Sequence, residues 1–407
     1  MVSIDLRKVF DRILHDPLFD ALRVQNVPEG YIQLLAALYS NQQGFVNGSR
    51  GFGIYRGVKQ GDVISPLLFN AGIEQAFRSW KIRLREHGFL LDASGTRFTN
   101  TRYADDVMLF AKSLEEATEM VELLIEEFAK LGLELNASKT KIITNEMVSY
   151  EYVDIAESMV AILGPNDEHR FLGRYISGNL DHRVHTEVQH RIKVAWMKFG
   201  QHSKTLCNKN ISIKLRLRLF DSTVSPSLLF GLAVLPLQAL CMEKLNIVQR
   251  KMMRKIVGWV RLPEEPWENT MRRMSVRVDS AVGQLKLKEW SARILDTQWK
   301  FVGRLKFLPS SSWPSRAAFW QPPEIDDPSC AFVPHRAQGR PFTRWDDKVT
   351  KFSCEHFGEI WQDVPHLSFL RALPKYVSEL SGHDVLVGDP TPLNTPSRVV
   401  YAPAHRI

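Results

Sequence analysis

The sequence has few cysteines and no secretory leader at its start, and both absences narrow the class of protein. Four cysteines among 407 residues are too few and too scattered for a disulfide scaffold, which fits a reducing, intracellular compartment. The first residues lack the charged and then apolar segments of a signal peptide. Hydrophobic residues amount to 44% and charged residues to 24%, so extensive disorder and collagen-like structure are excluded.

Zinc-binding and membrane-spanning signatures are also missing. Cys330 and Cys354, with the histidines near them, lack the paired spacing of a zinc module. Residues 222–242 carry no charge, and about 20 apolar residues suffice to cross a bilayer. This stretch contains Pro226 and Pro236 among several polar residues, however, which favours a buried helical hairpin over a membrane span. We therefore expect no membrane partner.

The chain is basic, and its positive charge is concentrated in one segment. The formal net charge is +8, yet residues 183–261 contain 15 lysines and arginines against three acids. That segment alone carries +12, so the rest of the chain is acidic overall. A local excess of this kind is what a groove for a polyanion requires. We predict nucleic-acid contacts there from Lys214, Arg216 and Arg218, on helices rather than on the strand that their alternation also allows.

Residues 1–180 mix strand-like alternation with helical spacing of apolar residues, which predicts an α+β domain. Turn residues, a capping box and a terminal glycine mark the boundaries. The predicted elements are a strand over 2–6, helices over 17–38 broken near residue 28, a hairpin over 45–55, a helix from Ser65 towards Trp80, a strand pair over 96–110 and a helix from Ser113 to Gly132.

Three carboxylates in this region could carry chemistry. Asp105 and Asp106 lie at the predicted tip of the 96–110 hairpin, and Asp5 lies within an apolar strand-like run. Two carboxylates held together repel unless a cation lies between them. Three around one point suit Mg²⁺, and two such ions serve phosphoryl transfer. Taken alone, an Asp-Asp pair is more often a solvated turn, and we interpret Asp346-Asp347 as a helix cap.

The segment over residues 56–70 strengthens the chemical interpretation. It places Gly57, Lys59, Gln60 and Gly61 directly before the helix that Ser65-Pro66 begins. Glycines let a backbone approach a ligand closely, and a helix N-terminus favours anions. In isolation the same segment would be an ordinary loop before a helix. What distinguishes it is its place between the Asp5 strand and the Asp105 hairpin.

This order of motifs resembles the reverse transcriptases of non-LTR retrotransposons (long interspersed elements). The first palm motif of that family has alanine where Val9 stands here, and the second commonly has proline in place of Val63. The resemblance extends strongly to about residue 180 and more weakly to about 300. The matching segments are residues 5–11, 57–70, 103–106, 132–141 and 171–173 for the five palm motifs, and 339–345 for a segment near the end of many such elements.

The resemblance implies a role for each candidate residue. Asp5, Asp105 and Asp106 would bind two Mg²⁺ ions, or Mn²⁺ in their place. Phe10 would reject a ribose 2′-hydroxyl, although a core aromatic is the simpler interpretation. Gln60 and Gly61 would line the pocket for nucleotide and template, and Lys139 would lie near the triphosphate. The implied partners are an RNA template, a DNA primer and dNTPs, and the implied compartment is the nucleus.

The sequence also departs from the family. Only four residues precede Asp5, so the fingers segments and the endonuclease of the family would belong upstream, and we expect an N-terminally truncated copy or a partial gene model. Two alternatives to an active polymerase follow. One is a catalytically inactive remnant that only binds nucleic acid, and the other is a palm-fold nucleotide cyclase or another two-metal enzyme.

The expected architecture is an α+β polymerase palm, an antiparallel sheet with packed helices, followed by a mostly helical basic thumb. Seven prolines between residues 309 and 341 exclude a continuous regular element there. The predicted domains are a palm with partial fingers over 1–180, a thumb-like domain over 181–305, a proline-rich linker over 306–342 and a small tail over 343–407.

Overall fold

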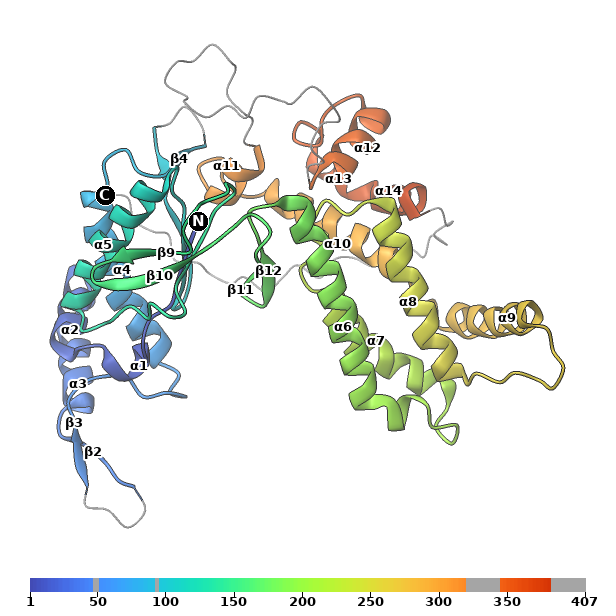
Figure 1. Cartoon of the computed structure of the whole chain (residues 1–407), viewed down its shortest axis with the longest axis horizontal. Coiled ribbons are helices and arrows are strands. Elements are labelled where there is room, and N and C mark those ends of the chain that lie inside the picture. The colour runs from blue at the N-terminus through green and yellow to red at the C-terminus, as the bar shows by residue number, and fades with distance from the viewer. Residues whose placement is uncertain (47–50, 92–94, 320–344, 382–407) are drawn as a thin grey trace. The chain divides into compact units, whose positions relative to one another are not determined.

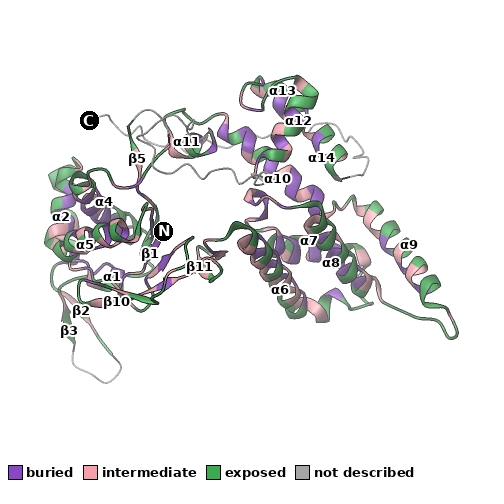
Figure 2. Cartoon of the chain, turned by 45° about the horizontal axis from the view of Figure 1, so that its top comes forward, coloured by how far each residue is buried: buried purple, intermediate pink, exposed green. Residues whose placement is uncertain are grey.

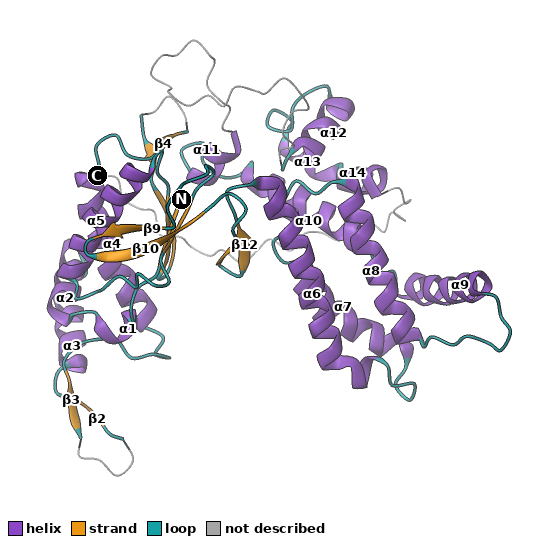
Figure 3. Ribbon diagram, viewed as in Figure 1, coloured by secondary structure: helices purple, strands orange, loops and turns teal. Residues whose placement is uncertain are grey.

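The computed structural model describes residues 1–46, 51–91, 95–319 and 345–381. The chain divides into two compact units, one formed by residues 1–190 and 308–339 and the other by residues 191–307 and 340–407. In the described residues the first unit combines strands with helices, whereas the second is helical (Figures 1 and 3). The α+β class predicted from the sequence is therefore confirmed.

A six-stranded sheet forms the centre of the first unit. Its pairs are antiparallel except for the parallel pair of β8 and β10. The strands from one edge to the other are β6 (Asn100–Tyr103), β7 (Asp106–Leu109), β1 (Val2–Ile4), β8 (Lys141–Ile143), β10 (Ser158–Leu163) and β9 (Tyr152–Ile155).

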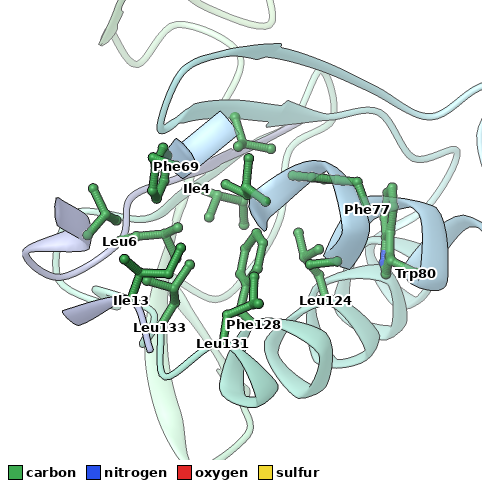
Figure 4. Packing of buried hydrophobic residues seen from close by; sticks show 14 of the residues in the cluster. Ile4, Leu6, Ile13, Phe69, Phe77, Trp80, Leu124, Phe128, Leu131 and Leu133 are labelled. Atoms are coloured by element: carbon green, nitrogen blue, oxygen red, sulfur yellow. The ribbon is translucent and has the colours of Figure 1, made fainter. Parts of the chain in front are cut away.

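Helices cover one face of this sheet. Val2 and Ile4 of β1, and Val107 and Leu109 of β7, alternate along their strands and join one buried cluster with the helices. Figure 2 colours buried residues purple, and Figure 4 shows Ile4 within this cluster. The fully buried Trp80 lies in the same cluster, and its indole nitrogen donates to the Met120 carbonyl at 2.9 Å. The helices of this part are α1 (Val9–Arg12), α2 (His15–Val24), α3 (Glu29–Tyr39), α4 (Ser65–Arg83) and α5 (Leu114–Lys130).

The other face of the sheet carries less apolar cover. Met108 of β7 and Ile143 of β8 form a small buried cluster with Ile176. Ile176 belongs to the hairpin of β11 (His169–Phe171) and β12 (Arg174–Ile176). Two further hairpins pair β2 (Gln42–Gly44) with β3 (Phe52–Ile54) and β4 (Phe89–Leu90) with β5 (Arg97–Phe98).

Helix α5 begins and ends where its capping residues predict. The Ser113 side chain accepts a hydrogen bond from the Glu116 amide at 3.1 Å, which caps the N-terminus. Gly132 follows the last turn with φ +74°, a left-handed conformation that glycine adopts without strain.

The second unit is a helical assembly with its own core. Its helices are α6 (Leu180–Leu206, which begins in the first unit), α7 (Ile213–Leu229), the 3₁₀ helix η1 (Leu232–Val234), α8 (Ala239–Val257), α9 (Trp267–Leu285) and α10 (Trp290–Leu305), followed by α12 (Asp347–Phe357), α13 (His366–Arg371) and α14 (Leu373–Ser381). Residues 214–219 are helical, as predicted.

Helices α12 to α14 do not form a separate domain, so the expected tail domain over 343–407 is not found in its described part. Trp299 of α10 is fully buried, and its ring lies 3.9 Å from that of Phe369 and 4.4 Å from that of Tyr376, measured between centroids. The helices after the proline-rich segment therefore complete the core of the second unit.

The predicted linker over 306–342 lies mostly outside the described residues, but its first part is ordered. It contains α11 (Trp313–Phe319), whose Trp313 ring lies 5.2 Å from Phe98 in the first unit. Asp346 stands at the N-cap position of α12 without a side-chain capping bond. Its buried carboxylate instead accepts from the Trp361 indole at 3.1 Å, which corrects the helix-cap interpretation.

One segment within the described residues is long and apolar enough to cross a membrane. It is Ile213–Val234, with a mean hydropathy of 1.2 and 39% of its window buried. Phe220, Val224 and Leu228 are fully buried in the second unit. The apolar stretch after residue 222 runs through α7 and η1 to the start of α8. Because several of its side chains are buried, we interpret it as part of the core of the second unit.

Candidate functional site

A two-residue turn carries Asp105 and Asp106 to the tip of the β6–β7 hairpin, as predicted. Tyr103 pairs with Asp106 at the end of the ladder, so Ala104 and Asp105 form the turn. Ala104 has φ +54°, because a tight hairpin turn needs a left-handed residue at its first position. Both aspartates are exposed to solvent.

The strand register brings Asp5 to the same place. Ile4 of β1 pairs with Val107 of β7, and one further step along both strands sets Asp5 opposite Asp106. Ile4 and Val107 face the helices. Side chains alternate along a strand, so Asp5 and Asp106 point to the opposite face, which the helices leave open.

Electrostatics support this grouping of carboxylates. Partial burial, followed by the charges of Asp105 and Asp5, raises the pKa of Asp106 above its usual value. Like charges close to one another disfavour ionisation, and a cation between them would relieve that cost. The oxygen donor set therefore fits a hard divalent cation. Within the described residues, however, no three acidic, histidine or cysteine side chains converge closely enough to form a complete metal site.

Asn136 contacts the candidate site, and the sequence analysis does not single it out. Its side-chain amide donates to Oδ2 of Asp5 at 2.9 Å, although the two residues lie 131 positions apart. Asn136 belongs to the segment 132–141 that resembles the fourth palm motif. Within that segment the sequence analysis predicts a role only for the charged Lys139, which is exposed.

The loop before α4 packs against α1. The main-chain nitrogen of Val58 donates to the Phe10 carbonyl at 2.6 Å, and that of Gly57 donates to the Ile13 carbonyl at 2.7 Å. The half-buried Phe10 ring lies 5.2 Å from that of the buried Phe69. Phe10 thus contacts the core, as its simpler interpretation predicts. Gln60 and Gly61 are exposed further along the loop.

Gly57→Ala should destabilise the first unit strongly. Gly57 has φ +89°, and a Cβ there would lie 2.7 Å from the Phe10 carbonyl oxygen. We expect a loss of about 2–4 kcal/mol in the free energy of unfolding, measured by urea denaturation. Gly61→Ala is the matched control, since Gly61 has φ +88° with no atom within 4 Å of the added Cβ. It should cost about 1 kcal/mol, from backbone strain alone. Equal losses would contradict the steric argument.

The three residues predicted to contact nucleic acid differ in their exposure to solvent. Lys214 and Arg218 are exposed one turn apart on α7. Arg216 is only 6% exposed, and its guanidinium donates to the carbonyls of Ile211, Leu206 and Ile256. The prediction that Arg216 binds nucleic acid is therefore wrong, because its donors are already used to join the ends of α6 and α8 to α7.

Arg216→Ala should act on stability rather than on binding. Buried carbonyl groups would lose a charged donor, so we expect a loss of about 2–4 kcal/mol in the free energy of unfolding. Lys214→Ala and Arg218→Ala should change stability by less than about 0.5 kcal/mol. Chemical denaturation of the three variants checks this order. A stable Arg216→Ala chain would restore Arg216 as a candidate surface residue.

Comparison with known proteins identifies similar sequences. Residues 1–176 match the family model described as reverse transcriptase (RNA-dependent DNA polymerase). An uncharacterized transposon-derived protein of Caenorhabditis elegans is 27% identical over 259 residues, covering 63% of this chain and 86% of that protein. The Pol polyprotein of the type-2 retrotransposable element R2DM of Drosophila melanogaster is 30% identical over 144 residues, covering 34% of this chain and 13% of the polyprotein.

Two further similarities cover more of this chain. The Pol polyprotein of a type-1 retrotransposable element R2 of Bradysia coprophila is 26% identical over 272 residues, covering 64% of this chain and 29% of the polyprotein. A solved structure of Candida albicans telomerase with a fragment of telomeric RNA aligns at a TM-score of 0.28 and 14% identity, covering 76% of this chain and 48% of that one. The chain thus spans less than a third of the length of these two R2 polyproteins.

Residues 1–176 are therefore similar to reverse transcriptases, a class of RNA-directed DNA polymerases. The matches to R2 retrotransposon polyproteins agree with the resemblance to non-LTR retrotransposon reverse transcriptases that the sequence motifs carry. The six-stranded sheet with its helices, followed in the chain by a helical unit, agrees with the predicted order of a palm and a mostly helical thumb-like domain.

Proposed function

We propose that this chain synthesises DNA on an RNA template, by transfer of a nucleotide from a dNTP to the 3′-hydroxyl of a primer. The observation that carries the proposal is the antiparallel register of β1 and β7, which sets Asp5 opposite Asp106 and beside the turn that contains Asp105. Asp5 and Asp106 lie on the sheet face that the helices leave open, and Asp105 lies in the turn beside them.

The reaction makes one bond and breaks another. The 3′-hydroxyl of the primer loses its proton to water, and its oxygen bonds to the α-phosphorus of the dNTP. The bond from that phosphorus to its bridging oxygen breaks, and pyrophosphate leaves. A pair of Mg²⁺ or Mn²⁺ ions, held by Asp5, Asp105 and Asp106, would neutralise charge on the attacking and leaving oxygens. The protein contributes position and charge, because phosphoryl transfer needs little covalent help.

The remaining candidate residues would select and hold the nucleotide. The ammonium group of Lys139 is exposed and would contact the triphosphate. Gln60 and Gly61 lie in the exposed loop before α4 and would contact nucleotide and template. Phe10 is anchored against Phe69, so its ring could act as a fixed barrier to a ribose 2′-hydroxyl. A fixed aromatic side chain suits such a barrier because it cannot move aside.

Primer extension tests the proposal. The purified chain, given a primed RNA template, Mg²⁺ and dNTPs, should lengthen the primer to a product whose sequence is the complement of the template. A chelator should stop the reaction, and rNTPs should be used poorly. A product that forms without a template, or a cyclic nucleotide, would assign the palm to a different two-metal reaction.

A function limited to nucleic-acid binding is the second candidate. The exposed Lys214 and Arg218, in the basic segment of the chain, favour it. This function predicts RNA or DNA binding whose log affinity falls linearly with log salt, without incorporation. Replacing both residues with alanine should reduce that slope by about two. An unchanged slope would place the binding surface elsewhere.

A further inference from the structure

Asp5 is the most firmly anchored of the three carboxylates. The Asn136 side chain donates to its Oδ2 at 2.9 Å, and the Asn136 main-chain nitrogen donates to the Asp5 carbonyl at 2.8 Å. The Asp5 main-chain nitrogen donates to Oγ1 of the buried Thr140 at 3.2 Å. Among the described residues, by contrast, no hydrogen bond reaches the carboxylates of Asp105 and Asp106.

The turn over residues 136–140 fixes the orientation of the Asn136 amide. Ser138 donates its hydroxyl to Oδ1 of Asn136 at 2.9 Å, so the oxygen end of the amide is occupied and the NH₂ end faces Asp5. The Lys139 and Thr140 main-chain nitrogens both donate to the Asn136 carbonyl, at 3.1 and 2.9 Å. The same turn therefore carries Lys139 and the anchor of Asp5.

We propose that Asn136 is a positioning residue that prepares Asp5 to bind a divalent cation through its other oxygen, Oδ1. This inference rests on the proposed function. With Oδ2 engaged by an amide donor, the carboxylate cannot rotate freely, and no described residue donates to Oδ1. Partners that orient a ligating carboxylate in this way typically change metal affinity or activity by about 10–100-fold.

A purely structural role for the side chain is the competing explanation. The backbone already joins these segments, through the bridge between Leu6 and Leu135 and the main-chain bond from Asn136 to Asp5. The side-chain amide adds a bond to the carboxylate alone. Removing it should therefore change what the carboxylate binds more than it changes the stability of the fold.

The test compares Asn136→Ala with the wild-type chain by two readouts. Isothermal titration with Mn²⁺ should show an affinity about 10–100-fold weaker in the variant. Primer extension should fall in kcat at low Mg²⁺ and recover as Mg²⁺ is raised, with little change in KM for the dNTP. Asn145→Ala, at an exposed asparagine just after β8, is the control and should match the wild type in both assays.

The outcomes separate this inference from the proposed function. A lower melting temperature with unchanged Mn²⁺ affinity would show a structural role and overturn the inference. If Asn136→Ala does not fold, Ser138→Ala replaces it, because the amide then loses its fixed orientation, and about fivefold weaker Mn²⁺ binding is expected. A wild-type chain that binds Mn²⁺ but does not extend primers would overturn the proposed function alone. A wild-type chain without Mn²⁺ affinity would overturn the inference.

Discussion

Asp106→Asn should reduce the rate of primer extension by about 1,000-fold. The asparagine keeps the shape of the side chain but removes the charge that a cation between Asp5 and Asp106 would require. Losses of about 10²–10³ are typical when one preorganised electrostatic contact to a transition state is removed. Single-nucleotide incorporation on a primed RNA template measures the effect, with the dNTP at saturation so that kcat is compared.

The sheet offers a matched control in Asp154→Asn. Asp154 is an exposed aspartate on β9, the strand at the far edge of the same sheet. Its substitution makes the same chemical change and should leave incorporation within about twofold of the wild type. If Asp106→Asn and wild type incorporate nucleotide equally, the carboxylates are not catalytic and the proposed reaction is wrong.

Asp106→Asn should lower activity but should not lower the stability of the fold. The pKa of Asp106 is raised in the folded chain by partial burial and then by Asp105 and Asp5. The stabilisation linked to this proton is fully present below the unfolded pKa and is lost as pH rises through the raised folded pKa. At neutral pH, Asp106→Asn should therefore melt at or above the wild-type temperature in a chelating buffer. A clearly lower melting temperature would show that its carboxylate stabilises the fold.

Local patterns predicted the elements that carry these carboxylates. The hairpin around Ala104 and the helix between Ser113 and Gly132 follow from turn chemistry, alternation and capping, which act within a few residues. The grouping of Asp5 with Asp105 came from the order of motifs. It could not have come from periodicity, because strand pairing depends on contacts between residues about a hundred positions apart.

The wrong prediction for Arg216 and the missed Asn136 have the same physical origin. Lys214 and Arg216 look alike in sequence, but two positions turn a side chain to the other side of a helix, and burial then depends on which neighbour lies there. Asn136 was missed because its partner is distant in sequence and its own residue type is ordinary in a turn. In each case the deciding contact is made between elements, and the pattern within one element does not specify it.

Trp299→Ala should be among the most damaging substitutions in the second unit. The ring is fully buried between α10 and the C-terminal helices, and its indole nitrogen donates to the Phe369 carbonyl at 3.1 Å. We expect a loss of about 3–5 kcal/mol in the free energy of unfolding, measured by urea denaturation. Trp267→Ala, at a tryptophan that is 58% exposed, is the control and should cost less than about 1 kcal/mol.

A double-mutant cycle decides whether the helices after the proline-rich segment share this core. Trp299→Ala and Phe369→Ala remove two rings that stack at 3.9 Å, so their effects should be less than additive, with a coupling of about 0.5–3 kcal/mol. If residues 345–381 formed an independent tail domain, Phe369→Ala would shift a separate transition and the two effects would add. Coupling in a single transition would show that one hydrophobic core joins segments on both sides of the prolines.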